Sequence, residues 1–315
     1  MISPLGFTLG QFLGRNLLTI LNYHQVVAEF DPLRPTEPTA AIFEQHLRTI
    51  KRYFAVFTLN DAMLHLQAGT LPPRALVITF DDGYANNHDV ALPLLQRYNI
   101  PATFFLTSAF VDGGAMWNDR LIEALRIGAI NDAALRAVDL EPTTILDQPL
   151  SQAVERLLQQ VKHQPADKRQ QTVERLCQTA PVPTLMMGAE QIARIHAAGM
   201  EIGGHSHSHP ILAALETESC RREITTNKQL LETIIGMPIR SFAYPNGKPE
   251  QDYTRDVIDA VKGAGYCQAV STAWGVNTAS TDPFQLRRFT PWRHSRLGFM
   301  GLLARNRFFE MPYVT

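Results

Sequence analysis

The sequence predicts an α/β fold built on a parallel sheet, and three observations lead to this class. Ala75–Phe80 holds only apolar or β-branched residues between Pro73 and Asp81-Asp82-Gly83, which is typical of an interior parallel strand. Similar apolar runs recur along the chain and alternate with stretches of helical period, the pattern of βαβ units. About seven such strands are expected, enough to close a sheet on itself. We therefore predict a distorted (β/α)7-type barrel.

The first part of the chain is expected to form three strands and three helices, and two of these helices begin at a polar capping residue. The elements expected here are a strand at 17–23 that delivers His24, a helix capped by Thr39 and running to about Tyr53, a shorter helix capped by Asn60 and closed by Gly69, the strand at 75–80, a helix over 87–98 and a strand over 101–107.

The pattern changes between about residues 112 and 188. Helical segments are expected near 119–127, 151–163 and 167–177, they are rich in Gln, Arg and Glu, and no strong strand signal lies between them. We interpret this region as a helical insertion in a single domain that spans residues 1–315.

The α/β alternation returns after residue 188, and no internal repeat is visible. The elements expected here are helices at 190–198, 217–235 and 252–264 and strands at 200–203, 240–243, 267–271 and 286–289.

Composition excludes several classes of protein. The formal net charge of -1 offers no field that would attract nucleic acid. Three cysteines lie far apart, without the spacing of a thiolate metal site or a disulfide set. Met1–Leu21 is apolar but interrupted, and it lacks the basic start and the cleavage site of a signal peptide. We expect a cytoplasmic location, with membrane association left open.

Asp81 and Asp82 are two adjacent carboxylates at the end of a buried strand. Two like charges brought together away from bulk water are costly unless a cation or a shared proton compensates them. A solvated turn is the alternative, because Asp-Gly is a common turn pair. The pair therefore predicts either a cation site or an exposed turn.

Three of the ten histidines lie within Gly203–Pro210. Neutral imidazole is a frequent ligand of zinc and similar ions. Four residues of continued strand would span about 13 Å, whereas in a helical turn they rise only about 6 Å. The flanking glycines and proline favour a turn, so we pair His205 with His209 and not with His207. A polar loop that bonds its own backbone is the alternative.

Two histidines and one aspartate leave positions open on a metal ion, as catalytic sites do. Asp81 and Asp82 can then divide the work, one binding the cation while the other accepts a proton from water. Both motifs follow strands, and the carboxyl ends of strands are where barrels build their active sites.

These residues resemble the polysaccharide deacetylases, which share the NodB homology domain. Thr79–Gly83 and His205–His209 look like its first two motifs, and Phe242–Gly247 resembles its third. Leu21–His24 is similar to the branch that deacetylates exopolysaccharide amino sugars. The resemblance covers about 17–107 and 190–290, and it implies the barrel of that family.

The resemblance also implies roles for individual residues: three metal ligands, a general base, an arginine that orients the base, and a general acid. Carried over, these are Asp82, His205 and His209 as ligands, Asp81 as base, Arg288 (or its neighbour Arg287) as the orienting arginine, and His24 as the acid that protonates the departing amine.

The third motif departs from the family pattern. Where many members have an arginine and a tyrosine, this chain has Ala243 and Asn246. The backbone N–H at Asn246 can still serve as an oxyanion donor. Tyr244 and Asn246 are the expected substrate or oxyanion contacts, and Trp117 is a candidate for stacking against a sugar or for packing alone.

The function implied is metal-dependent removal of N-acetyl groups from amino sugars of a polysaccharide or its lipid-linked precursor. Zinc fits two histidines and a carboxylate best, with cobalt, nickel or manganese as alternatives. Hydrolysis of a small non-sugar amide and an inactive glycan-binding module are the competing hypotheses.

The segment at about 291–315 is basic and apolar. Residues 287–307 contain six arginines and no acidic residue. A helix that covers the barrel is the first interpretation, and peripheral contact with a membrane is the second.

Overall fold

The computed structural model describes residues 16–308 and 311–314. The prediction about an interrupted apolar N-terminus therefore falls largely outside the described residues. The chain forms two compact units. The barrel unit takes the chain up to Glu29, then Thr36–Ala109 and the chain from Met187 onward, and the helical unit takes Phe30–Pro35 and Phe110–Met186.

A parallel sheet of seven strands forms the centre of the barrel unit, with the order β1-β3-β4-β5-β6-β7 and with β2 also paired to β3. The predicted fold class is confirmed. The strands are β1 (Leu18–Tyr23), β2 (Ala55–Phe57), β3 (Ala75–Phe80), β4 (Thr103–Leu106), β5 (Glu201–Gly204), β6 (Ser241–Ala243) and β7 (Gln268–Val270). The sequence analysis missed β2, whose three residues are only partly buried and too few to show a period.

Residues 286–289 connect the two outer strands of the sheet. Leu286 bridges Val270 of β7, and Phe289 bridges Leu21 of β1, both in parallel orientation. The predicted strand at 286–289 is thus a pair of single bridges, because its backbone pairs with β7 at one end and β1 at the other. These bridges close the ring of hydrogen bonds.

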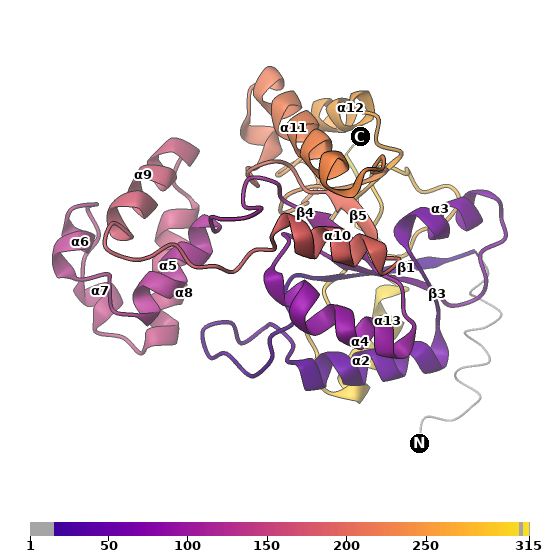
Figure 1. The fold of residues 1–315 in the computed structure, drawn as a ribbon, viewed down its shortest axis with the longest axis horizontal. Helices are drawn as coiled ribbons and strands as arrows, with labels where there is room; N and C mark the ends of the chain where they lie inside the picture. Colours follow the sequence, from indigo (N-terminus) through magenta and orange to yellow (C-terminus); the bar gives the residue numbers. More distant parts are fainter. Residues whose placement is uncertain (1–15, 309–310, 315) are drawn as a thin grey trace. The chain divides into compact units, whose positions relative to one another are not determined.

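Helices surround the sheet on its outer face (Figure 1). Contacts run from α2 to η1 and α4, then to α10, α11 and α12, and α13 lies against α2. The bounds are α2 (Ala40–Tyr53), α3 (Leu59–Gln67), the π-helix η1 (Asn87–Ala91), α4 (Leu92–Tyr98), α10 (Ala189–Ala197), the 3-10 helix η2 (Leu212–Ala214), α11 (Thr217–Ile235), α12 (Arg255–Gly263) and α13 (Arg296–Asn306).

The predicted caps had different outcomes. Thr39 caps α2 and accepts a hydrogen bond from the Ile42 N–H, as predicted. The prediction of Asn60 as a cap is wrong: Asn60 lies inside α3, and Thr58 caps that helix. The helix expected over 87–98 begins as a π-turn, because Pro93 in the next turn has no N–H for the usual i to i−4 bond.

The barrel buries its strands on both faces, which explains why β3 is a continuous apolar run. On the outside, Phe80 stacks on Tyr23 and Phe104. On the inside, Val77 and Phe105 belong to one apolar cluster with residues of α3.

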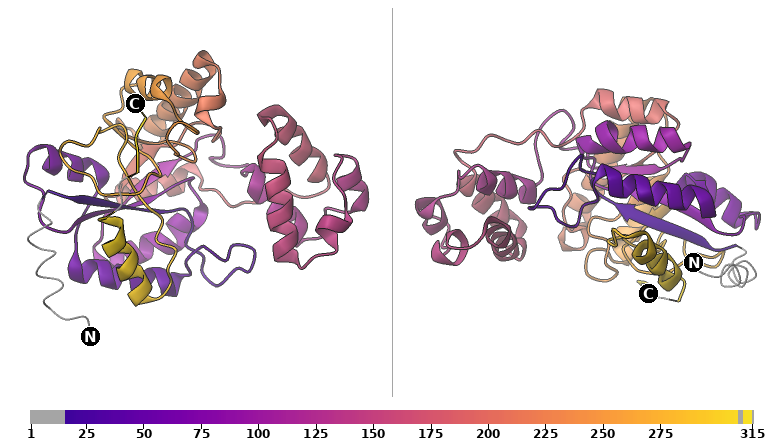
Figure 2. Two further views of the ribbon diagram at one scale, coloured as in Figure 1. Left: turned by 180° about the vertical axis from the view of Figure 1, so that it is seen from behind. Right: turned by 90° about the horizontal axis from the view of Figure 1, so that it is seen from below.

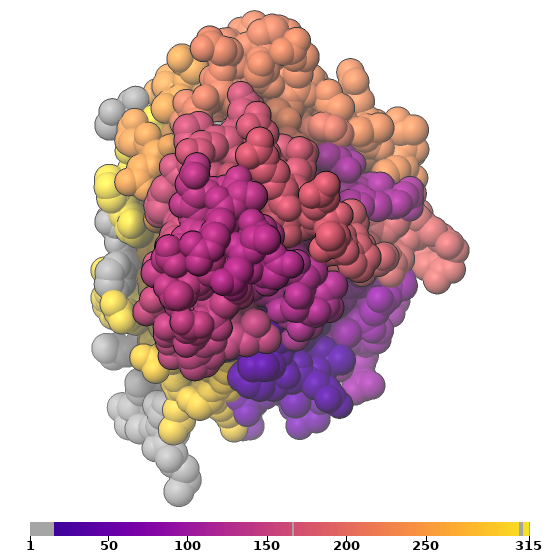
Figure 3. All heavy atoms as spheres, turned by 90° about the vertical axis from the view of Figure 1, so that its left-hand side faces the viewer, coloured from indigo at the N-terminus to yellow at the C-terminus, as the bar shows by residue number. Residues whose placement is uncertain are grey.

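The helical unit consists of five helices with their own apolar core (Figure 2). Figure 3 shows the atoms of its helices, in magenta and rose, closely packed against one another. Arg34 ties the segment Phe30–Pro35 to this unit through Asp119 and Glu123, both at 2.8 Å. The bounds are α5 (Trp117–Arg126), α6 (Asp132–Arg136), α7 (Thr143–Leu146), α8 (Leu150–Lys162) and α9 (Ala166–Leu176).

Three of these helices lie where they were expected, and the sequence analysis missed the short α6 and α7. That the region is an insertion into a single domain stays a prediction.

The C-terminal helix α13 buries Phe299, Leu302 and Leu303. The Phe299 ring stacks on His46 of α2, with ring centroids 4.1 Å apart. The apolar residues of this segment therefore serve in part to cover the barrel, the first of the two interpretations. Among the described residues, no helix combines the length and the apolar character needed to span a bilayer.

Candidate metal centre and active site

Asp81 and Asp82 leave β3 in a strained turn. Asp82 has φ 80° and Gly83 has φ 99°, in the left-handed region that few residues other than glycine adopt. The Asp82 carbonyl accepts hydrogen bonds from the N–H and hydroxyl of Thr107, which follows β4. The neighbouring strand thus holds the turn that sets the direction of each carboxylate.

The loop after β5 also turns through left-handed residues. Ser206 has φ 59° and His209 has φ 60°, and the Ser206 hydroxyl accepts from the His209 N–H at 3.1 Å. This turn brings the His205 and His209 rings to 4.9 Å between centroids. His207 contacts Ser108 instead, at 2.9 Å.

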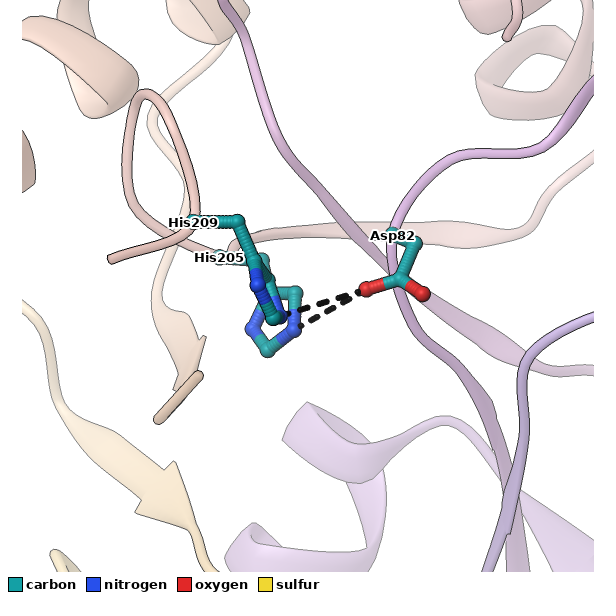
Figure 4. A group of neighbouring side chains, drawn as sticks. All are labelled: Asp82, His205 and His209. Carbon is teal, nitrogen blue, oxygen red and sulfur yellow. Dashed lines mark ion pairs between the residues drawn. The ribbon is translucent and has the colours of Figure 1, made fainter. Parts of the chain in front are cut away.

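Asp82, His205 and His209 form a group whose ligand atoms all lie within 4.8 Å of one another (Figure 4). The Asp82 Oδ1 atom is 3.4 Å from His205 Nε2 and 3.5 Å from His209 Nε2. The structure brings together the three residues predicted as metal ligands.

The donor set of this group fits a divalent cation. His205 Nδ1 donates to the Ala243 carbonyl at 2.7 Å, which leaves Nε2 to offer its lone pair toward Asp82. Asp82 Oδ1 is buried and has no hydrogen-bond partner among the described residues. A bound cation can compensate acceptors that converge without a donor between them.

Electrostatics favour the metal-binding protonation state at Asp82 and His209 but not at His205. Burial raises the pKa of Asp82, but the two imidazoles outweigh it and hold that pKa below its ordinary range. Burial lowers the pKa of His209 to about 4, so this imidazole is neutral near pH 7. Burial also lowers the pKa of His205, but Asp81 and Asp82 have the larger effect and raise it overall. A proton and a metal ion therefore compete for His205.

Asp81 is held by Arg288. The Arg288 Nη1 donates to Asp81 Oδ1 at 2.7 Å and Nη2 donates to Oδ2 at 2.5 Å, in a bidentate pair that is fully buried. Burial raises the pKa of Asp81, but Arg288 and His205 outweigh it and lower that pKa. The carboxylate therefore stays ionised.

Arg287, the alternative to Arg288, points elsewhere. Its guanidinium donates to the Met311 carbonyl and lies 4.0 Å from the centroid of the Tyr313 ring. Arg288 is thus the arginine in contact with Asp81.

His24 follows β1, at the same end of the barrel. Its carbonyl accepts from Asn87 at 2.8 Å. In the register of β1 and β3, Tyr23 pairs with Phe80, so the next residues, His24 and Asp81, lie side by side. An electrostatic interaction with His24 contributes to lowering the pKa of both Asp81 and Asp82. This position is compatible with the acid role predicted for it.

Two residues of the third motif, Tyr244 and Asn246, differ in burial and in hydrogen bonding. Tyr244 donates its hydroxyl to the Phe284 carbonyl at 3.0 Å and its N–H to the Val270 carbonyl at 3.2 Å, and it is fully buried. Both donors are used inside the barrel unit, so we correct the prediction that Tyr244 contacts substrate. Asn246 is exposed with φ 58°, and its N–H has no partner among the described residues.

Trp117 lies at the start of α5 in the helical unit. It packs against the apolar core of that unit, with Arg169 5.4 Å from its ring centroid. Packing accounts for its position, and its role in sugar stacking stays a prediction.

Sequence reasoning missed the polar residues that hold Arg288. Asn22 and Thr79 are register partners on β1 and β3, and both accept from Arg288 Nη1, at 3.1 and 3.2 Å. Their signal was present: each is a polar residue within a buried strand that consists mainly of apolar residues.

Comparison with known proteins shows similarity in sequence and similarity in structure. The chain is 27% identical over 135 residues to a poly-beta-1,6-N-acetyl-D-glucosamine N-deacetylase of Staphylococcus epidermidis, which covers 38% of this chain and 46% of that protein. It is 34% identical over 70 residues to the protein of the same name from Staphylococcus aureus strain N315, 22% of this chain and 24% of that protein. These matches span less than half of each relative.

Solved structures share the fold. The Streptococcus pyogenes deacetylase PplD, in complex with acetate, has a TM-score of 0.61 at 17% identity and covers 91% of this chain and 97% of its own. IcaB from Ammonifex degensii has a TM-score of 0.61 at 17% identity, with 92% and 97% covered. The family profile described as polysaccharide deacetylase matches residues 68–269, which include Asp81, Asp82 and both histidines. The chain therefore belongs to the polysaccharide deacetylase family.

Proposed function

We propose that this protein is a metal-dependent hydrolase that removes N-acetyl groups from the amino sugars of an exopolysaccharide and releases acetate. The observation that carries the proposal is the group formed by buried Asp82, buried His205 and partly buried His209, beside an ionised Asp81 held by Arg288. Membership of the deacetylase family supports the reaction, and the names of the staphylococcal relatives support a β-1,6-linked N-acetylglucosamine polymer as substrate.

Asp82, His205 and His209 would hold the metal, and zinc suits two imidazoles and one carboxylate. When bound, such an ion supplies Lewis acidity at the carbonyl of the scissile amide. Because His205 donates Nδ1–H to Ala243, its ring orientation is set before a metal arrives.

Asp81 is the proposed general base. Arg288 occupies one lone pair on each Asp81 oxygen and leaves the others free to accept a proton from water. His24, near both carboxylates, is the proposed acid that protonates the nitrogen of the leaving amine. The N–H of the exposed residue Asn246 is the proposed backbone donor to the oxyanion.

Acetate release tests the proposal. Purified protein is incubated with β-1,6-linked N-acetylglucosamine oligomers, with and without a chelator, and its metal content is measured. We expect one divalent ion per chain, acetate release that the chelator abolishes, and recovery when zinc is restored. Release that survives complete metal removal contradicts the proposal.

The same assay separates the competing functions. Acetate release from small non-sugar amides but not from oligomers identifies a small-amide hydrolase, and oligomer binding without release identifies a glycan-binding module. A lipid-linked N-acetylated sugar, run beside the free oligomer, tests whether the precursor is the preferred substrate.

A cytoplasmic location stays a proposal, and so does peripheral contact of the C-terminal segment with a membrane. Leu297 and Phe308 of this segment are 72% and 87% exposed, next to exposed Arg296. Sedimentation with anionic liposomes tests it: we expect binding that Leu297→Glu weakens, and equal sedimentation of the two proteins contradicts it.

A further inference from the structure

Helix α11 contacts both ends of the loop His205–His209, which we call the histidine loop. Asn227 is fully buried on this helix, and Glu223 lies one turn earlier on the same face. The loop residues that they contact are His205, Ser206 and Ser208. Neither α11 residue was singled out by the sequence analysis, and neither belongs to the proposed metal ligands.

Asn227 connects the start of the loop to β4. Its Oδ1 accepts from the His205 N–H at 3.2 Å, and its Nδ2 donates to the Ser206 carbonyl at 2.7 Å and to the Leu106 carbonyl at 2.9 Å. One side chain therefore sets the backbone on both sides of the first histidine. Among the described residues, the Ser206 carbonyl depends on Asn227 alone, whereas the His205 N–H and the Leu106 carbonyl also bond to each other at 3.1 Å.

Glu223 holds the other end of the loop. Its carboxylate accepts from the Ser208 N–H at 2.8 Å and from the Ser208 hydroxyl at 2.7 Å. Ser208 immediately precedes His209, the second histidine of the candidate site. The two α11 side chains thus bracket the segment that must bring both imidazoles to one ion.

The loop needs external support because its backbone is strained. Ser206 and His209 both adopt positive φ, which L-residues with a Cβ avoid unless surrounding contacts impose it. Gly204 shows how closely Asn227 fits: a Cβ at that position would lie 2.5 Å from Asn227 Oδ1 and 2.1 Å from the Tyr266 hydroxyl. The end of β5 and α11 therefore pack too closely at this point to admit a larger side chain.

We propose that Asn227 and Glu223 are positioning residues that set the separation of His205 and His209 and thereby the affinity and geometry of the metal site. This inference rests on the proposed metal-dependent function. Changing the outer partners of metal-binding histidines typically costs about 10- to 100-fold in metal affinity.

Two substitutions test the two contacts. Asn227→Asp keeps the shape but replaces the Nδ2 donor with an oxygen that faces two carbonyls, and Glu223→Ala removes both acceptors at Ser208. Thr225→Ala is the matched control on the same helix, because its hydroxyl bonds only to backbone of α11 itself. Circular dichroism confirms that each variant is folded.

The readouts are the dissociation constant for zinc, measured by chelator competition, and the visible absorption of the cobalt-substituted protein. We expect both substitutions to weaken zinc binding about 10-fold or more and to change the cobalt spectrum, with Thr225→Ala unchanged. If folded Asn227→Asp and Glu223→Ala both keep the wild-type zinc affinity and cobalt spectrum, this inference is wrong and the proposed function is not affected. If Asn227→Asp does not fold, Glu223→Ala decides the test. Absence of metal binding by the wild-type protein overturns the proposed function, and this inference with it.

Discussion

The two ends of the barrel each contain partly or fully buried carboxyl groups, in opposite electrostatic settings. At the carboxyl end of the strands, Asp81 pairs with a buried guanidinium and Asp82 faces two imidazoles. At the amino end, Glu201 opens β5 and lies beside the first residues of β4 and β6, Thr103 and Ser241.

Glu201 is satisfied by neutral donors. Its Oε2 accepts from the Thr103 hydroxyl and from the Asn60 N–H, both at 2.9 Å, and its Oε1 accepts from the Ser241 hydroxyl. Gln268, the first residue of β7, donates in turn to Ser241. These polar residues join four strands and α3 at the end of the barrel opposite the candidate site.

The two ends differ in the direction in which the pKa values of their carboxyl groups are shifted. Neutral donors satisfy Glu201 without compensating a charge, and burial raises its pKa. Arg288 and the neighbouring imidazoles outweigh burial at Asp81 and Asp82 and lower their pKa values. Glu201 has no acceptor left without a partner, whereas Asp82 Oδ1 has no donor. Carboxylates at the carboxyl end are therefore ionised and available, as active sites at this end of a barrel require.

The largest expected effect is loss of turnover in Asp81→Asn. An amide cannot accept the proton from water, so acetate release should fall by about 10²- to 10⁴-fold. Bound zinc, measured by elemental analysis, should remain. Because Arg288 would be buried beside a neutral group, thermal stability should also fall. Full activity in this variant contradicts the base assignment.

Asp82→Asn should act on the metal. Asparagine tolerates the left-handed backbone at this position, so the turn should persist. Loss of the anionic ligand should raise the zinc dissociation constant by more than the ~10- to 100-fold typical of outer partners. Competition with a chelator measures it, and unchanged affinity would remove Asp82 from the site.

Arg288→Lys should produce a smaller loss. Lysine keeps the charge but cannot make the bidentate pair with Asp81, so kcat should fall about 10-fold while zinc binding is unchanged. The matched control is Arg287→Lys, whose side chain contacts Met311 and Tyr313 and not Asp81. Equal kcat in the two variants would contradict the role of Arg288.

Glu201→Gln should have the smallest effect on activity and a distinct effect on stability. The raised pKa of Glu201 means that the folded state binds its proton more tightly than the unfolded state. The contribution of Glu201 to wild-type stability should therefore fall as pH rises from the ordinary pKa of 4.5 through the raised one. The variant lacks this decline.

Urea unfolding at pH 4.5 and pH 7.5 measures the difference. The free energy of unfolding of Glu201→Gln relative to wild type should increase between the two pH values, with acetate release unchanged. A relative decrease would mean that Glu201 behaves like Asp81 and Asp82, and the contrast between the two ends would not hold.

Local sequence was sufficient for the features that lie within one segment. The apolar run Ala75–Phe80 predicted a buried strand, and Asp81 and Asp82 after it, like the histidines after β5, predicted a polar site at the strand ends. The turn required between His205 and His209 followed from the chain length between them. These inferences hold because strand burial and short loop geometry depend on neighbouring residues.

Only the tertiary structure decided which distant residues meet. Asp81 and Arg288 are 207 positions apart, and the choice between Arg287 and Arg288 depends on which side chain faces the inside when residues 286–289 bridge β7 and β1. For the same reason Tyr244 is buried, with its hydroxyl and its N–H bonded inside the barrel unit. The alternation of side chains is local, but which of the two faces lies inside a closed barrel is set by its pairing partners.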